Sequence, residues 1–341
     1  MSFILQRSLV PSGAFHRFLS TSTLLDHAEN YVKWDPNPTT VQAVEMILSS
    51  NDNNESSLAP LFEGRLSFGT AGLRAPFGPG YNCMNDLTVI QTAQGLLKYL
   101  EESGTGVKKR GIVVGYDHRA SKEFTAYDLS SEIFAKITAA VFQSQGVPVF
   151  LYDRLVATPL VPFGVEEMDA ACGVMVTASH NPKEDTGYKV YWGNGAQIIP
   201  PHDKGIADKI LENLEPWETY EMGGVSKWEE GARMEELYFN KMKRECFNGR
   251  GGEGAPLTYT AMHGVGHEFA KKAFDKFGLT PFVSVVEQVR RGVRSEVRRS
   301  MDKQLTLFGR HFDRRRRFRT QRLEQLRFQT QRRERGRSSW R

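Results

Sequence analysis

The sequence of 341 residues contains no long hydrophobic run and few cysteines. No apolar stretch approaches the roughly 20 residues that a membrane-spanning helix needs, so we expect no membrane partner. The three cysteines (Cys83, Cys172 and Cys246) are odd in number, and none stands in a C-x-x-C spacing. This pattern predicts a reducing, cytoplasmic environment and argues against a zinc site.

Basic residues are scarce outside the C-terminus, although the net charge of the whole chain is +5. Residues 290–341 contain 18 Arg and one Lys against five acidic residues, a local charge of +14. The remaining 26 basic and 35 acidic residues give residues 1–289 a charge of −9. The body of the chain is therefore acidic and carries no general signature of nucleic-acid binding.

The tail at residues 288–341 differs in kind from the rest. It contains no Ala and carries a near-repeat, F-R-T-Q and F-Q-T-Q. An arginine-rich arm that binds nucleic acid is one interpretation. The other, which we favour, is disordered low-complexity sequence, because so one-sided a use of Arg over Lys suggests a shifted reading frame.

The first 25 residues contain no acidic residue and several Ser. A mitochondrial transit peptide has this composition. A disordered or alternative start also explains it, and we favour that interpretation. We assign residues 1–54 to an N-terminal extension that includes one short helix, expected at 40–49.

Strand and helix patterns alternate along the middle of the chain. Helical spacing of apolar residues and short apolar runs predict helices at 86–102, 129–145 and 202–214 and strands at 111–117, 147–152, 171–176 and 188–192. This alternation predicts a layered α/β domain with a mixed sheet over residues 55–215. A helix near 235–246, a strand at 257–262 and a helix from about 265 suggest a second, incomplete α/β domain over 216–287.

The stretch V-M-V-T-A-S-H-N-P, residues 174–182, places Ser179 and His180 side by side after an apolar run. Adjacent residues on an extended backbone point to opposite sides, so this pair is a poor nucleophile and base of the catalytic-triad kind. The Asn-Pro pair that follows predicts an exposed turn. Ser179 therefore needs another chemical explanation.

Three further features suit the binding of a phosphate group. Gly69, Gly72 and Arg74 form a glycine-rich loop with a cation, a combination that brings backbone N–H groups and a guanidinium to phosphate oxygens. Lys189 and His180 can transfer protons or neutralise charge. His263 stands before an expected helix, whose N-terminus favours anions. Taken singly, each feature is more often an ordinary turn or a structural histidine.

Taken in order, these stretches resemble one family. F-G-T-A-G-L-R, T-A-S-H-N-P, G-Y-K-V-Y-W-G-N-G and M-H-G-V-G are similar to motifs of the α-D-phosphohexomutases, and longer matches are similar to the phosphoglucomutase/phosphopentomutase branch. The resemblance covers residues 30–288. It implies a monomeric isomerase of carbohydrate metabolism that moves a phosphoryl group between sugar phosphates through a phosphoserine and a sugar bisphosphate.

The resemblance also implies roles for individual residues. Ser179 would carry the phosphoryl group and hold Mg²⁺ through it, with glucose 1,6-bisphosphate as primer. Lys189 and His180 would be acid/base groups, and Arg74 would steady the transferring phosphate. Phosphate-binding roles would fall to a set that shares the glycine loop, the serine turn and the later histidine: Gly69, Thr70, Gly72, Arg74, Asn181 and His263.

The family's aspartate ligands for Mg²⁺ have no counterpart here, because no D-x-D occurs in the sequence. The sequence also shows no counterpart of the family's sugar-binding loop or of its distal phosphate-binding loop. We therefore expect this chain to be inactive as a mutase, and sugar specificity cannot be read from it. The alternative is a non-catalytic phosphosugar-binding or regulatory fragment with a basic tail.

Overall fold

The computed structural model describes residues 21–50, 55–70, 72–122, 125–217, 225, 228, 230–245 and 257–289, all within one compact unit. The predictions for residues 1–20 and for the Arg-rich tail from residue 290 onward lie outside the described residues. Among the described helices, none combines the length and the apolar composition that a bilayer crossing demands.

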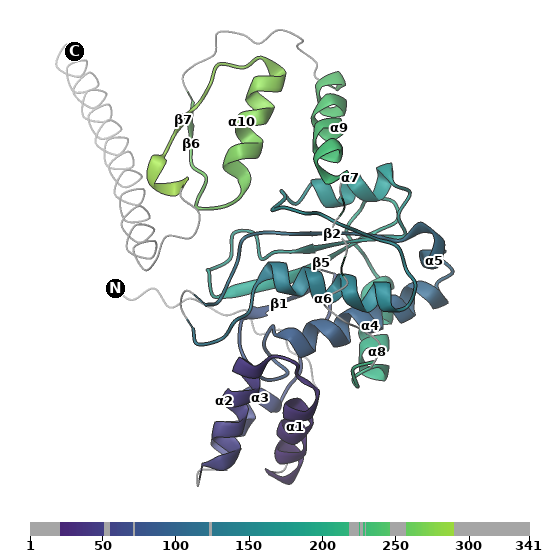
Figure 1. The fold of residues 1–341 in the computed structure, drawn as a ribbon, viewed down its shortest axis with the longest axis vertical. Coiled ribbons are helices and arrows are strands. Elements are labelled where there is room, and N and C mark those ends of the chain that lie inside the picture. Colours follow the sequence, from purple (N-terminus) through teal and green to yellow (C-terminus); the bar gives the residue numbers. More distant parts are fainter. Residues whose placement is uncertain are drawn as a thin grey trace, which may run out of the picture. The chain divides into compact units, whose positions relative to one another are not determined.

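A five-stranded mixed sheet occupies the centre of the described domain (Figure 1), in the order β1-β5-β4-β2-β3. Strand β2 pairs in parallel with β3 and β4, whereas β5 is antiparallel to β4 and to β1. The expected mixed-sheet α/β fold is confirmed. The strands are β1 (Leu73–Pro76), β2 (Ile112–Tyr116), β3 (Val149–Leu151), β4 (Cys172–Val176) and β5 (Asp185–Trp192).

Helices cover both faces of this sheet (Figure 1). One face carries α4 (Asp86–Glu102) and α6 (Ser131–Ser144), and α8 (His202–Glu212) packs on α4. The other face carries α7 (Leu160–Glu167), and the single-turn helix α5 (Val107–Arg110) leads into β2. The periodic helices α4, α6 and α8 were expected. Helix α7 was not, because it is short and contains Pro162 and Gly164, which both have low helix propensity.

Alternate residues of the central strands face opposite apolar layers. Ile112 and Val114 pack with residues of α4 and α6, whereas Val113 packs with residues of α7. Every residue of β2 and β4 is buried, as expected for strands covered on both faces. Gly173 lets α7 approach closely, since a Cβ there would lie 2.6 Å from Val165 Cγ2.

Three N-terminal helices form a separate apolar cluster. They are α1 (Thr21–Trp34), α2 (Pro38–Ser49) and α3 (Glu55–Phe62). Their apolar residues contact one another, and the largest fully buried ones are Leu24, Tyr31, Leu58 and Phe62. Only the α2 region was expected to be helical. Residues 21–25 of the acid-free start, for which we favoured a disordered or alternative start, instead belong to α1.

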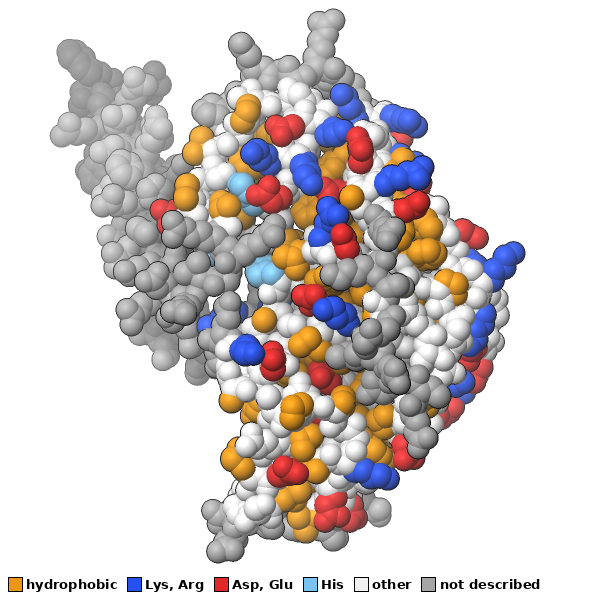
Figure 2. Space-filling view, viewed as in Figure 1, with side chains coloured by type: hydrophobic (Ala, Val, Ile, Leu, Met, Phe, Trp, Pro, Cys, Tyr) orange, Lys and Arg blue, Asp and Glu red, His pale blue; other side chains and the backbone are white. Residues whose placement is uncertain are grey.

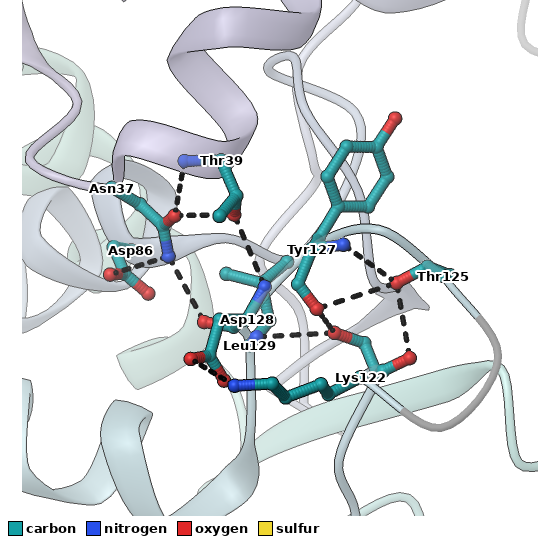
Figure 3. A network of polar contacts seen from close by, with 9 residues as sticks. Asn37, Thr39, Asp86, Lys122, Thr125, Tyr127, Asp128 and Leu129 are labelled. Atoms are coloured by element: carbon teal, nitrogen blue, oxygen red, sulfur yellow. Dashed lines mark hydrogen bonds and ion pairs between the residues drawn. The ribbon is translucent and has the colours of Figure 1, made fainter.

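A polar network joins these helices to the sheet domain (Figure 3). Asn37 caps α2 and donates from Nδ2 to Asp86 Oδ2 at 3.2 Å and to the Asp128 carbonyl at 3.1 Å. The Asp128 N–H donates to Thr39 Oγ1 at 3.1 Å. The side chain of Asp86, at the start of α4, is therefore buried where the two parts meet.

The described residues after 230 begin with α9 (Gly231–Arg244). A short parallel pair follows, β6 (Thr258–Tyr259) and β7 (Val283–Ser284), with α10 (Gly266–Phe277) between them and a 3-10 turn at Val286–Gln288. The strand β7 was not expected. On the face shown in Figure 2, Lys and Arg side chains are interspersed with Asp and Glu side chains, so charges of both signs share this surface.

Candidate active site

The turn between β4 and β5 exposes the side chain of Ser179. Its backbone has φ +55, in the left-handed region, and serine is one of four non-glycine residues with positive φ in the described chain. That conformation costs roughly 1–2 kcal/mol for a residue with a Cβ. Such strain persists only where surrounding contacts impose it, and it is concentrated at functional sites.

Lys189 on β5 reaches the Ser179 hydroxyl. Residue 189 lies opposite Met175 of β4, and its Nζ donates to Ser179 Oγ at 2.7 Å. Partial burial lowers the pKa of Lys189, and the nearby positive charge of Arg74 lowers it further. The structure therefore brings together the serine and the lysine that the sequence separates by ten positions.

Arg74 approaches the same turn from β1. It lies opposite Gly187 of β5, and its Nη1 donates to Asn181 Oδ1 at 3.1 Å. Asn181 in turn donates from Nδ2 to Asp185 Oδ2 at 3.0 Å. The guanidinium of Arg74 is exposed, so it can also contact an anion at Ser179.

The glycine loop acts as a tight turn in front of β1. Gly69 and Gly72 form an antiparallel bridge in which each N–H donates to the other carbonyl, at 3.2 and 2.7 Å. Gly72 has φ +76, and a Cβ there would lie 1.8 Å from the Tyr188 carbonyl oxygen. The Thr70 carbonyl accepts from Gln197 Nε2 at 2.7 Å. The turn thus holds Arg74 beside β5, while contact of the loop with phosphate stays a prediction.

The two candidate histidines have different settings. His180 is exposed beside Ser179, and no hydrogen bond joins the two side chains among the described residues. His263 has φ +59, and its N–H donates to the Gln288 carbonyl at 2.9 Å in the segment after β6. The acid/base role of His180 and the phosphate role of His263 stay predictions.

Sequence reasoning missed Arg119, which lies under the serine turn. Its terminal nitrogens donate to four backbone carbonyls of that turn, those of Ser179, Asn181, Pro182 and Asp185, at 2.7–2.9 Å. Its Nε is 3.2 Å from Asp117 Oδ2. The signal was available: D-H-R follows β2, and the ends of the parallel strands β2 and β4 meet at one edge of the sheet.

The charge around Ser179 suits a phosphate more readily than a bare cation. Lys189 and Arg74 present positive groups, whereas the carboxylate of Asp117 accepts from Thr177 at 2.7 Å and pairs with Arg119. In the described part of the chain, no three His, Cys, Asp or Glu side chains cluster as metal ligands. These residues alone therefore do not fit the expected Mg²⁺ site, and we derive no step through a metal.

Comparisons with known proteins show what this chain is similar to. Residues 65–216 match the model of the phosphoglucomutase/phosphomannomutase α/β/α domain I. A mouse protein named phosphopentomutase is 43% identical over 272 residues, which are 76% of this chain and 42% of that protein. A human glucose 1,6-bisphosphate synthase is 43% identical over 265 residues, again 76% of this chain and 42% of its own length.

A solved structure supports the same fold. A putative phosphomannomutase from Thermus thermophilus superposes with a TM-score of 0.54 at 26% identity, covering 65% of this chain and 46% of that one. The chain thus spans less than half the length of the relatives that it matches.

Proposed function

Since this chain belongs to the phosphoglucomutase/phosphomannomutase family through its domain I at residues 65–216, we propose that Ser179 is the phosphoryl carrier of a phosphosugar mutase. The observation that carries the proposal is the 2.7 Å hydrogen bond from Lys189 Nζ to the Oγ of an exposed serine in a left-handed turn. The substrates are pentose and hexose phosphates, because relatives are named phosphopentomutase and glucose 1,6-bisphosphate synthase.

The chemistry is a phosphoryl exchange at Ser179 Oγ. In the first step the P–Oγ bond of phosphoserine breaks while a hydroxyl oxygen of a sugar monophosphate bonds to the phosphorus. The hydroxyl loses its proton and Oγ gains one, so the products are Ser179 and a sugar bisphosphate. In the second step the P–O bond between the sugar and the other phosphoryl group breaks while Oγ bonds to that phosphorus, and the proton of Oγ passes to the released sugar oxygen.

Lys189 is placed to serve the proton transfer at Oγ. Its ammonium already donates to Oγ, so it can protonate this oxygen as the P–Oγ bond breaks. The lowered pKa of Lys189 makes this donation easier than from an ordinary lysine. His180, exposed beside the turn, is the proposed base for the sugar hydroxyl.

The positive groups serve the charge of the transferring phosphate. Phosphoryl transfer depends mainly on positioning and on electrostatic stabilisation of the phosphate oxygens. Lys189 and the exposed guanidinium of Arg74 approach the serine turn from the neighbouring strands β5 and β1. A Mg²⁺ ion, when bound by a complete site, would supply further charge neutralisation to the same oxygens.

The test is transfer of label to one serine. The full chain is incubated with ³²P-labelled glucose 1,6-bisphosphate, and tryptic peptides are analysed by mass spectrometry. We expect label on Ser179, none in Ser179→Ala, and unchanged labelling in the control Ser50→Ala, which removes an exposed serine at the end of α2. Equal labelling of Ser179→Ala would contradict the proposal.

A coupled assay with ribose 1-phosphate and with glucose 1-phosphate then measures turnover and sugar preference. The expectation that this chain is inactive as a mutase is tested by the same assay. Binding of sugar phosphate without labelling of Ser179 would favour the alternative of a non-catalytic phosphosugar-binding protein. The cytoplasmic location and monomeric state stay predictions.

A further inference from the structure

Arg119 is unusual because backbone carbonyls occupy its terminal nitrogens. Nη1 donates to Pro182 O and Asp185 O at 2.7 Å each, and Nη2 donates to Ser179 O and Asn181 O at 2.9 Å each. A guanidinium has two N–H groups on each terminal nitrogen, so all four have an acceptor. Its side chain is only 11% exposed. Arg119 therefore has no terminal N–H left for a phosphate.

A second chain of contacts leads from Arg119 to the other side of Ser179. Arg119 Nε pairs with Asp117 Oδ2 at 3.2 Å, and Thr177 Oγ1 donates to the same oxygen at 2.7 Å. The Ser179 N–H donates to Thr177 Oγ1 at 2.9 Å. The two side chains that link Arg119 to the Ser179 N–H are hardly exposed, with Asp117 at 8% and Thr177 at 3%.

These two sets of contacts hold both peptide groups of residue 179. Thr177 accepts from its N–H, and Arg119 donates to its C=O. The left-handed backbone of Ser179 is thus fixed from both sides, and this fixes the direction in which Oγ points toward Lys189. Without these contacts, the turn would relax toward the more favourable conformations of a residue with a Cβ.

We infer that Arg119, acting through Asp117 and Thr177, is a positioning residue that aims Ser179 Oγ and does not itself bind the phosphate of the substrate. This inference rests on the proposed phosphoryl transfer at Ser179. It separates the cations of the site into two kinds. Lys189 and Arg74 face the reacting oxygen or its surroundings, whereas the terminal nitrogens of Arg119 all donate to backbone carbonyls.

Two variants test the inference, each with a matched comparison. Thr177→Val removes the hydroxyl at nearly constant shape, whereas the comparison variant Thr177→Ser keeps the hydroxyl and removes only the methyl group. Arg119→Lys keeps the charge beside Asp117 but cannot bridge four carbonyls. Arg74→Gln removes an exposed cation that can contact phosphate. Thermal unfolding of each variant checks that the domain is folded.

The first measurement separates transfer rate from phosphate binding. We expect Thr177→Val and Arg119→Lys to slow single-turnover labelling of Ser179 by about a hundredfold, the order of effect that a misplacement of about 1 Å produces. The dissociation constant for inorganic phosphate should stay within about threefold in both, since neither change removes a phosphate ligand, but rise about tenfold in Arg74→Gln. Thr177→Ser should label within about threefold of the wild-type rate.

The second measurement does not depend on activity. Amide hydrogen exchange at Ser179 should quicken about tenfold in Thr177→Val, the factor expected for loss of one net hydrogen bond, and return in Thr177→Ser. If the wild type takes up no label, the proposed function fails and this exchange result still decides the positioning role. Unchanged exchange in Thr177→Val, or a loss of phosphate affinity in Arg119→Lys as large as in Arg74→Gln, would overturn the inference.

Discussion

Asp86 is a buried carboxylate whose ionisation should make the stability of the chain depend on pH. It is 5% exposed, and among the described atoms its Oδ1 has no hydrogen-bond partner. Burial, and then the nearby charges of Asp35 and Asp128, raise the pKa of Asp86 to about 7, although the hydrogen bond from Asn37 acts in the opposite direction. Burial also raises the pKa of Asp35.

The sign of the effect follows from comparing the folded and unfolded states. Unfolded, Asp86 titrates near 3.8, so between pH 4 and 7 the folded chain binds the proton more tightly. Stability therefore falls as pH rises through this window, by about 1.4 kcal/mol per pH unit, and levels off above the folded pKa. The whole interval corresponds to at most about 4 kcal/mol, a large share of the typical stability of a domain.

Asp86→Asn should remove the part of this dependence that Asp86 contributes. Asparagine keeps an oxygen for Asn37 Nδ2 but carries no charge to bury. Loss of the negative charge at the start of α4 should cost about 0.5 kcal/mol through the helix dipole. We expect the variant to be about 3–4 kcal/mol more stable than the wild type at pH 8 and about 1 kcal/mol more stable at pH 5.

Urea unfolding of the full chain at pH 5, 6, 7 and 8, followed by circular dichroism, measures these differences. Asp169→Asn is the control, because its carboxylate is 85% exposed, pairs with Arg110 at the surface, where such pairs contribute little, and is not among the charges that act on Asp86. A wild-type stability that is flat from pH 5 to 8, or a parallel loss of stability in Asp86→Asn, would refute the reasoning.

Two further predictions concern the site. Gly72→Ala should lower the free energy of unfolding in urea by about 3 kcal/mol or more, because it combines a positive φ with a Cβ 1.8 Å from the Tyr188 carbonyl oxygen. The control Gly69→Ala has open space around its Cβ and should cost below about 1 kcal/mol. Equal costs in the two variants would show that the turn can shift freely. Phosphate affinity should fall as pH rises through the pKa of Lys189, and this fall should occur at a lower pH than for an ordinary lysine because that pKa is lowered. In calorimetric titrations at several pH values, Lys189→Arg should abolish the fall. An identical pH profile in the variant would contradict the role of Lys189.

The sequence was sufficient to predict the mixed sheet, because β2 and β4 are continuous apolar runs between periodic helices. It was not sufficient for β1, which lies in a stretch that we interpreted only as a glycine loop. The strand forms there because the turn at Gly69–Gly72 presents residues 73–76 to the edge of β5. That pairing is a tertiary contact, and local propensity does not encode it.

The N-terminal helices show a similar limit. Their composition suggested an extension because the first 25 residues lack acidic side chains. What makes α1 a helix is the packing of Leu24 and Tyr31 against Phe62, a contact between residues more than 30 positions apart. Apolar packing of this kind stabilises helices more than propensity does.

The residues of the candidate site could be predicted where they belong to a contiguous sequence motif. Their mutual contacts could not be predicted, because these depend on how the strands pair. Ser179, Asn181 and Arg74 stood out as motif residues, but their mutual approach requires β5 to pair with β4 on one side and with β1 on the other. Arg119 was missed because its only signal, its place in D-H-R directly after β2, gains meaning once the parallel pairing of β2 with β4 brings the two strand ends together.

The positions of Lys189 and His180 explain why a serine beside a histidine need not be a triad. His180 is adjacent in sequence, yet Lys189, ten residues away, is the group that contacts Oγ. The antiparallel pairing of β4 and β5 folds the chain back so that residue 189 lies opposite residue 175, just before the turn. A phosphoryl carrier needs exposure and a nearby positive charge more than it needs a base that removes its proton. The turn at Ser179 meets both requirements, because its side chain faces solvent while its backbone is bound from below by Arg119.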